Sequence, residues 1–101
     1  MAKLTMSIVL KKHIRNNELV FAICDSDLKG KSFEEGNLSL NLDCNFYDGS
    51  LSDIEDIKKA ILDSKSGVAV GESSVSLVKD LFPDIEIRFV NNVPFVNIFK
   101  F

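Results

Sequence analysis

The pair of residues that most resembles a catalytic unit is Cys24 beside Asp25, at the end of an apolar stretch. A nucleophilic cysteine reacts as its thiolate, which a neighbouring histidine or a helix N-terminus normally stabilises. A neighbouring carboxylate instead raises the pKa of the thiol by like-charge repulsion. Adjacent side chains in a strand also point to opposite faces. We therefore predict that Cys24 is a buried packing residue and that Asp25 caps a turn.

Two glycine-containing loops have backbone N–H groups that suit an anion. In the first, Lys29 and Lys31 flank Gly30, but the loop lacks the residue spacing of a phosphate-binding loop. In the second, Gly71 precedes Glu72 at a strand-to-helix junction, where unpaired N–H groups attract negative charge. Glu72 opposes an anionic ligand, because its own carboxylate suits that helix N-terminus. For both loops we favour the structural interpretation, an exposed turn and a helix start.

Aromatic residues supply the remaining candidates. Tyr47, beside Phe46, combines a flat ring with a polar tip, and both properties suit stacking on a base or contact with a partner. The sequence ends with Phe95, Phe99 and Phe101 on or near one strand. Such a strand would present an apolar edge, at which it could pair with another subunit.

Metal and cofactor chemistry have little support in the sequence. His13 is the only histidine, and the two cysteines, Cys24 and Cys44, are not part of a Cys-x-x-Cys pair. A structural zinc site usually needs four such ligands. We therefore predict no metal and no cofactor, and we expect both cysteines to be free thiols.

The composition is that of one globular domain. With 101 residues, 46% of them hydrophobic and 27% charged, the chain is expected to form a single domain over residues 1–101. No apolar run approaches the roughly 20 residues needed to cross a bilayer, and the first residues lack the pattern of a signal peptide. We therefore expect a cytoplasmic protein that does not associate with membranes.

The charge distribution along the chain bears on nucleic-acid binding. The net charge is −3, which argues against a dedicated nucleic-acid binder. Basic residues nevertheless outnumber acidic ones in the first third of the chain. A basic face is one interpretation, although ordinary solvated side chains are the favoured one. The basic residues concerned are Lys11, Lys12, Arg15, Lys29 and Lys31.

Apolar periodicity predicts the elements that position these residues. Ser52 and Glu55 have the spacing of a capping box, and the helix that they begin is expected to end at Gly67. A second helix is expected between Glu72 and Pro83. Strands are predicted at residues 6–12, 19–24, 38–42, 68–70, 85–90 and 95–99. This order of elements predicts the α+β fold class, as a two-layer sandwich with a mostly antiparallel sheet and both helices on one face.

Four segments resemble, in the same order, an archaeal family known as domain of unknown function 424. They are residues 22–33, 46–49, 70–75 and 92–95, and the first contains Cys24-Asp25 and Gly30-Lys31. The resemblance implies an α+β two-layer fold and an intracellular archaeal protein, with no known function. One departure is that Phe95 stands where the family tends to have a histidine.

Three hypotheses about function follow. The first is a non-enzymatic binding module for RNA or a protein partner, associated with translation. The second is a homo-oligomer, such as a homodimer, that pairs through the C-terminal edge strand. The third is a small enzyme using Asp25 or Glu72, with Asp27 or Cys24 nearby, and we consider it less favoured. The candidate ligand-binding residues are Asp25, Lys29, Lys31, Tyr47, Gly71 and Glu72.

Overall fold

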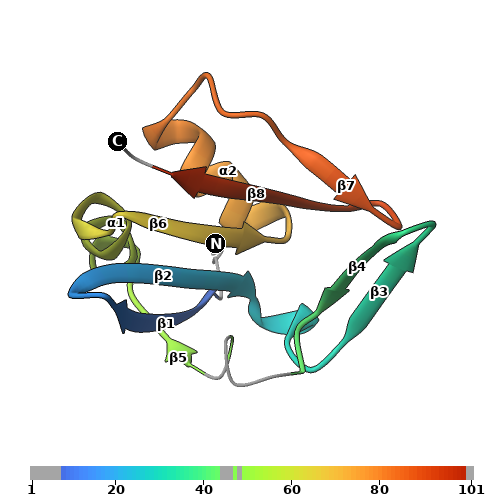
Figure 1. Ribbon diagram of the computed structural model, residues 1–101, viewed down its shortest axis with the longest axis horizontal. Helices are drawn as coiled ribbons and strands as arrows, with labels where there is room; N and C mark the ends of the chain where they lie inside the picture. The colour runs from blue at the N-terminus through green and yellow to red at the C-terminus, as the bar shows by residue number, and fades with distance from the viewer. Residues whose placement is uncertain (1–7, 44–46, 48, 100–101) are drawn as a thin grey trace, which may run out of the picture.

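One six-stranded sheet organises the chain, with the strand order β5-β1-β2-β6-β8-β7 (Figure 1). The computed structural model describes residues 8–43, 47 and 49–99. Neighbouring strands are antiparallel except β2 and β6, which run parallel because the chain crosses between them through a helix. The strands are β1 (Ile8–Arg15), β2 (Glu18–Asp25), β5 (Ser50–Leu51), β6 (Ser66–Val70), β7 (Arg88–Val90) and β8 (Val93–Phe99).

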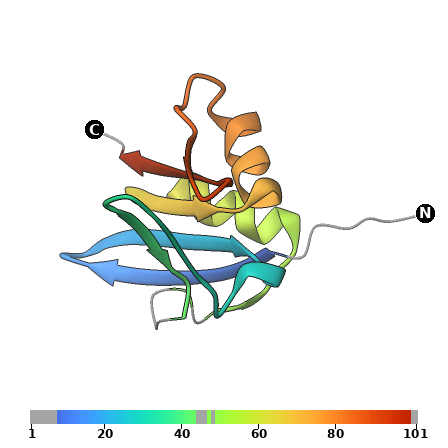
Figure 2. The same ribbon diagram turned by 90° about the vertical axis from the view of Figure 1, so that its right-hand side faces the viewer.

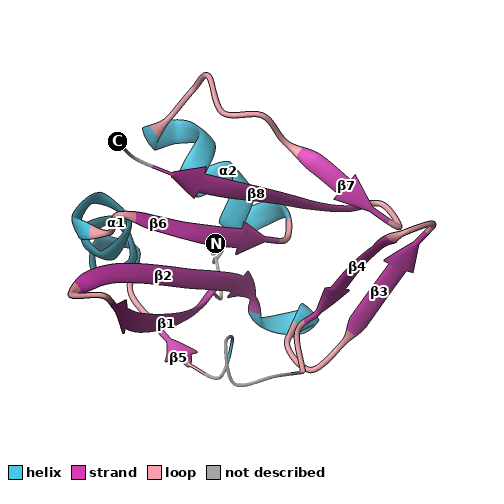
Figure 3. Ribbon diagram, viewed as in Figure 1, coloured by secondary structure: helices cyan, strands magenta, loops and turns pink. Residues whose placement is uncertain are grey.

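Two helices, α1 (Ile54–Asp63) and α2 (Glu72–Leu81), pack on one face of this sheet (Figures 2 and 3). Each helix has an apolar stripe at helical spacing, and burial of that stripe against the strands stabilises it. The predicted α+β sandwich, with a mostly antiparallel sheet and both helices on one face, is confirmed. The buried helical residues are Ile57, Ala60, Ile61, Ser74, Val75, Leu77 and Val78.

The other face of the sheet is only partly covered, by a hairpin that the sequence did not predict as a unit. It consists of β3 (Ser32–Glu35) and β4 (Leu38–Asn41), and it follows the short 3-10 helix η1 (Ser26–Leu28). Its apolar side chains join a second core cluster around Cys24 and Tyr47. The Glu35 carboxylate accepts a hydrogen bond of 2.6 Å from the Asn91 N–H, which ties the hairpin to the β7–β8 turn.

Paired asparagines form the turns of the β1–β2 and β7–β8 hairpins. Asn16 and Asn17 have φ values of 54° and 66°, and Asn91 and Asn92 have values of 51° and 69°. Two consecutive residues with positive φ match the right-handed twist of the flanking strands, and asparagine tolerates this conformation. The first turn places Arg15 opposite Glu18 at one end of the sheet.

The capping box predicted at Ser52 and Glu55 is wrong. The Ser52 hydroxyl donates to the Ser50 carbonyl oxygen at 3.1 Å, and α1 begins later, with Asp53 as its N-cap residue. Ser52 directly follows the short strand β5, and its hydroxyl bonds back to that strand instead of to the start of the helix. The N-cap was therefore predicted one residue too early, at Ser52 instead of Asp53.

Gly67 does not end α1, because the helix stops at Asp63 and Gly67 lies within β6. A Cβ atom at Gly67 would overlap the Phe21 ring, so the glycine allows the ring to cross that strand. The strand predicted at 85–90 is shorter, because only Arg88–Val90 pairs with β8. Neither described helix has the length and apolar content needed to cross a bilayer. The predictions that fall outside the described residues concern Met6, Cys44, Phe46 and Phe101.

Candidate functional site

The carboxylate of Asp25 lies at the N-terminus of α2 and caps it. Its Oδ2 atom accepts a hydrogen bond of 3.1 Å from the Ser73 N–H. Its Oδ1 atom accepts two bonds of 2.9 Å, from the N–H and from the hydroxyl of Ser74. Ser74 is fully buried, so this carboxylate satisfies donors that would otherwise be costly to bury. Asp25 therefore caps a helix 48 residues away rather than its own turn.

Gly71 is shaped by the same contact. Its φ is 104° and its ψ is 159°, a conformation that is almost restricted to glycine, and a Cβ atom there would overlap the Asp25 carboxyl group. Its N–H donates to the Pro94 carbonyl oxygen at 2.8 Å. The structure thus brings together two of the predicted site residues, Asp25 and Gly71. The anion at this helix N-terminus is a side chain of the protein itself.

Cys24 is completely buried in the second core cluster, as predicted. Burial, and to a lesser extent the nearby Asp25 carboxylate, raise the pKa of its thiol to about 11, whereas Lys29 has an opposing effect. At neutral pH the thiol is protonated and inaccessible. Cys24 is therefore a packing residue and lacks the properties of a nucleophile.

The other predicted residues do not come together in one site. Lys29 and Lys31 are exposed in the connection between η1 and β3, where backbone hydrogen bonds to Leu28 and Leu42 hold the turn. Glu72 is exposed at the first position of α2. None of these three charged residues lines the cleft that contains Tyr47.

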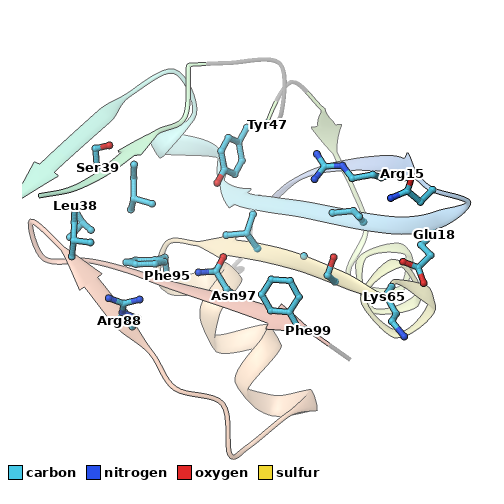
Figure 4. Close-up of a pocket in the computed structure, with 17 residues that line it drawn as sticks. Arg15, Glu18, Leu38, Ser39, Tyr47, Lys65, Arg88, Phe95, Asn97 and Phe99 are labelled. Carbon is cyan, nitrogen blue, oxygen red and sulfur yellow. The ribbon is translucent and has the colours of Figure 1, made fainter. Parts of the chain in front are cut away.

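That cleft, which we call the open-face cleft, lies on the sheet face opposite the helices, beside the β3–β4 hairpin (Figure 4). Its volume is about 760 Å³. The floor comes from β2, β6 and β8, and the walls come from β4, Tyr47 and the ends of β1 and β7. The lining residues are Arg15, Asn16, Glu18, Val20, Leu38, Ser39, Leu40, Tyr47, Lys65, Ser66, Gly67, Val68, Arg88, Val90, Phe95, Asn97 and Phe99.

The open-face cleft is positively charged, although the whole chain is acidic. Its described lining residues include Arg15, Lys65 and Arg88 against the single acid Glu18, whereas the net charge of the chain is −3. Within the part of the chain that the structure describes, none of these three basic side chains has an ion-pair partner. The Arg88 guanidinium carbon lies 5.8 Å from the centre of the Phe95 ring, in cation–π geometry.

Aromatic side chains face the same cleft from opposite sides. Tyr47 is only 8% exposed, and its hydroxyl group points into the cleft from the hairpin side (Figure 4). Phe99 is 74% exposed on β8 and offers a ring to a ligand. Among the described residues no three His, Cys, Asp or Glu side chains lie close enough together to hold a metal ion. The cleft therefore suits an anionic ligand that carries a flat ring system.

Sequence reasoning identified Tyr47 but did not assign Lys65, Arg88 or Asn97 to a site. The alternation on β8 was visible, with Phe95, Asn97 and Phe99 sharing a face. The missing information was that the hairpin covers Phe95 but leaves Phe99 open. The predicted basic face is also divided, because Lys12 faces the helix side of β1.

Comparison with known proteins gives a family and a fold. Residues 13–101 match a family described as "Protein of unknown function (DUF424)". A solved structure described as that of an uncharacterized conserved protein from Methanopyrus kandleri, an archaeon, is similar with a TM-score of 0.75. It is 26% identical, and the similarity covers 90% of this chain and 89% of that chain. No protein with a curated functional description matches.

Proposed function

The chain belongs to the DUF424 family of proteins of unknown function, and we propose that it is a binding module that takes single-stranded RNA into the open-face cleft. The observation that carries the proposal is the combination of unpaired basic side chains with the exposed ring of Phe99 on one sheet face. Proteins that bind single strands combine these two features, because the backbone is anionic and every base has a flat face.

The geometry favours an unpaired strand over a duplex. Recognition of a base by a sheet requires that the base lie flat on an aromatic side chain, which is accessible only when the base is unstacked. The open-face cleft lies between Tyr47 and Phe99, and the hairpin stands along one side of it. A strand that places one base on Phe99 would bring its phosphates near Arg15 and Lys65, at the end of the cleft away from Leu38 (Figure 4).

An enzymatic role receives no comparable support. Both carboxylate oxygens of Asp25 are engaged by the N-terminus of α2. Cys24 is buried, and the pKa of its thiol is about 11. A catalytic thiol would need access to a substrate, which Cys24 lacks, and a catalytic carboxylate would need an oxygen that is not already engaged in capping a helix.

Fluorescence anisotropy with a labelled ten-nucleotide RNA tests the proposal. We expect binding that weakens as salt rises, because phosphate contacts release counterions. Arg15→Ala combined with Lys65→Ala should weaken binding and reduce the slope of log affinity against log salt by about 1.4, since each single-strand contact contributes about 0.7. Lys12→Ala is the matched control, because Lys12 lies on the same strand but faces the helix side.

Two results would contradict the proposal. One is the absence of salt-sensitive affinity for any single strand at 50 mM salt. The other is an equal loss of affinity in Lys12→Ala and in Arg15→Ala, which would mean that general charge rather than the cleft governs binding. A duplex of the same length should bind more weakly than the single strand.

A second candidate function is assembly of two copies through the outer edge of β8. Strand β7 pairs only with Val93–Phe95 of β8. On that side of β8, no strand of the described chain lies beside residues 96–99, which pair with β6 on their other side. This edge carries no charge, whereas exposed edges are usually protected by lysine or proline. Antiparallel pairing of two identical edges is self-complementary, so the expected partner is a second copy. A monomeric mass by light scattering at 100 µM would contradict this candidate.

A further inference from the structure

We infer that Asn97 recognises a base held in the open-face cleft and that the preferred base is adenine. The inference rests on the proposed function, and it adds a residue that determines specificity. Nothing in the packing of β8 accounts for an amide at this position. The exposed Phe99 ring beside Asn97, in contrast, is a surface on which a base could stack and form hydrogen bonds with that amide.

Asn97 is an unusual residue for its strand. Asparagine is depleted in β-strands, and the other six residues of β8 are all apolar. The residue paired with it on the neighbouring strand β6 is Val68, which has no polar group in its side chain. In the described part of the chain the Asn97 amide makes no hydrogen bond, and the residue is exposed. The Asn97 amide is therefore not needed as a hydrogen-bond partner for any described group of the fold.

The neighbours of Asn97 supply a stacking platform on one side only. Phe95 and Phe99 lie two residues away in each direction, on the same face and about 7 Å along the strand. Phe95 is 6% exposed and already has Arg88 over its ring. Phe99 is open, so a base that stacks there has its edge directed along the strand toward Asn97 (Figure 4).

The amide is suited to a base edge that has a hydrogen-bond donor beside an acceptor. It offers an acceptor oxygen and a donor nitrogen side by side, and asparagine pairs in bidentate fashion with the amino group and ring nitrogen of adenine. Adenine presents such a pair on both its Watson–Crick and its Hoogsteen edge, whereas guanine presents two acceptors on its Hoogsteen edge, which arginine or lysine matches. Adenine is also a large base, which favours stacking on the Phe99 ring. Pyrimidines also have a donor beside an acceptor, but their smaller rings stack less on Phe99, so the two properties together favour adenine.

The test uses U10 RNA and three versions with one central uridine replaced by adenosine, guanosine or cytidine. Wild-type protein should bind the adenosine version about tenfold more tightly than the others. Asn97→Ala should abolish this preference and leave the salt dependence unchanged. Asn97→Asp should shift the preference toward guanosine, because two acceptor oxygens match the two adjacent N–H donors of guanine. Asn37→Ala, at an exposed turn outside the cleft, should behave as wild type.

The outcomes separate the inference from the proposed function. If all four oligonucleotides bind with salt-sensitive and equal affinity, the inference is overturned and the proposed function stands. The inference also fails if the adenosine preference persists in Asn97→Ala. If none of the four binds, the proposed function fails and the inference fails with it. Comparing ratios of affinities, rather than single values, removes the general electrostatic effect of the new aspartate.

Discussion

Two polar regions of this molecule contrast with each other, the N-terminus of α2 and the open-face cleft. At the helix, the Asp25 carboxylate accepts three hydrogen bonds from Ser73 and Ser74. In the cleft, Arg15 and Lys65 have no ion-pair partner among the described residues. Both regions contain charged side chains beside an apolar core. Only the first region is internally satisfied.

The contrast separates residues that determine the fold from residues that are available to a ligand. Polar groups that satisfy each other inside the protein contribute to stability, because each lost partner leaves a buried donor or acceptor unpaired. Polar groups that have no internal partner and face a cleft contribute little to stability. Substitutions at the helix should therefore affect unfolding, and substitutions in the cleft should affect binding.

The largest expected effect is at Gly71. Gly71→Ala would force a Cβ atom into the Asp25 carboxyl group from a backbone conformation that alanine avoids. Strain and overlap of this kind together cost about 4 kcal/mol. Urea denaturation followed by circular dichroism measures the loss. Gly30→Ala is the control, because Gly30 also has a positive φ but has no atom within 4 Å of the added carbon, so its cost should be about 1 kcal/mol.

Removal of the cap itself should cost somewhat less. Asp25→Ala deletes a charged acceptor of three hydrogen bonds and leaves the buried Ser74 hydroxyl unpaired, so we expect a loss of about 3 kcal/mol in unfolding free energy. Asp27→Ala removes a carboxylate from the exposed turn nearby and should change stability by less than about 0.5 kcal/mol. Equal losses of unfolding free energy in the two variants would mean that the hydrogen bonds from Asp25 to α2 do not stabilise the protein.

In the cleft the opposite pattern is expected. Phe99→Ala should weaken binding of single-stranded RNA about tenfold through the lost stacking, and should change stability by less than about 0.5 kcal/mol, because the ring is 74% exposed. Phe89→Ala is the matched control, since this ring is 58% exposed but lies outside the cleft. A large loss of stability in Phe99→Ala would place this ring with the fold-determining residues instead.

The two regions also differ in how far the sequence predicted them. The alternation on β8 and the periodicity of α2 predicted strand, helix and layers, because burial on one face imposes a pattern on neighbouring residues. The contact between Asp25 and Gly71 joins residues far apart in the chain, and no local pattern encodes it. Likewise, the sequence showed that Asn97 shares a face with Phe99, but only the position of the β3–β4 hairpin reveals that this face is open.

The smallest expected effect concerns Cys24, in the satisfied region beside Asp25. Burial raises the pKa of its thiol from 9.0 to about 11, so the folded protein retains this proton at a pH where the unfolded chain has released it. The stabilising contribution is therefore complete below about pH 9 and is lost as the pH rises toward 11. Between pH 8 and pH 10 the unfolding free energy of wild type should fall by about 1 kcal/mol more than that of Cys24→Ala. The variant loses some packing at every pH, but it lacks this slope, and lysine titration is common to both proteins. Parallel slopes would mean that the thiol ionises equally easily in the folded protein, and Cys24 would then be accessible to solvent rather than part of the core.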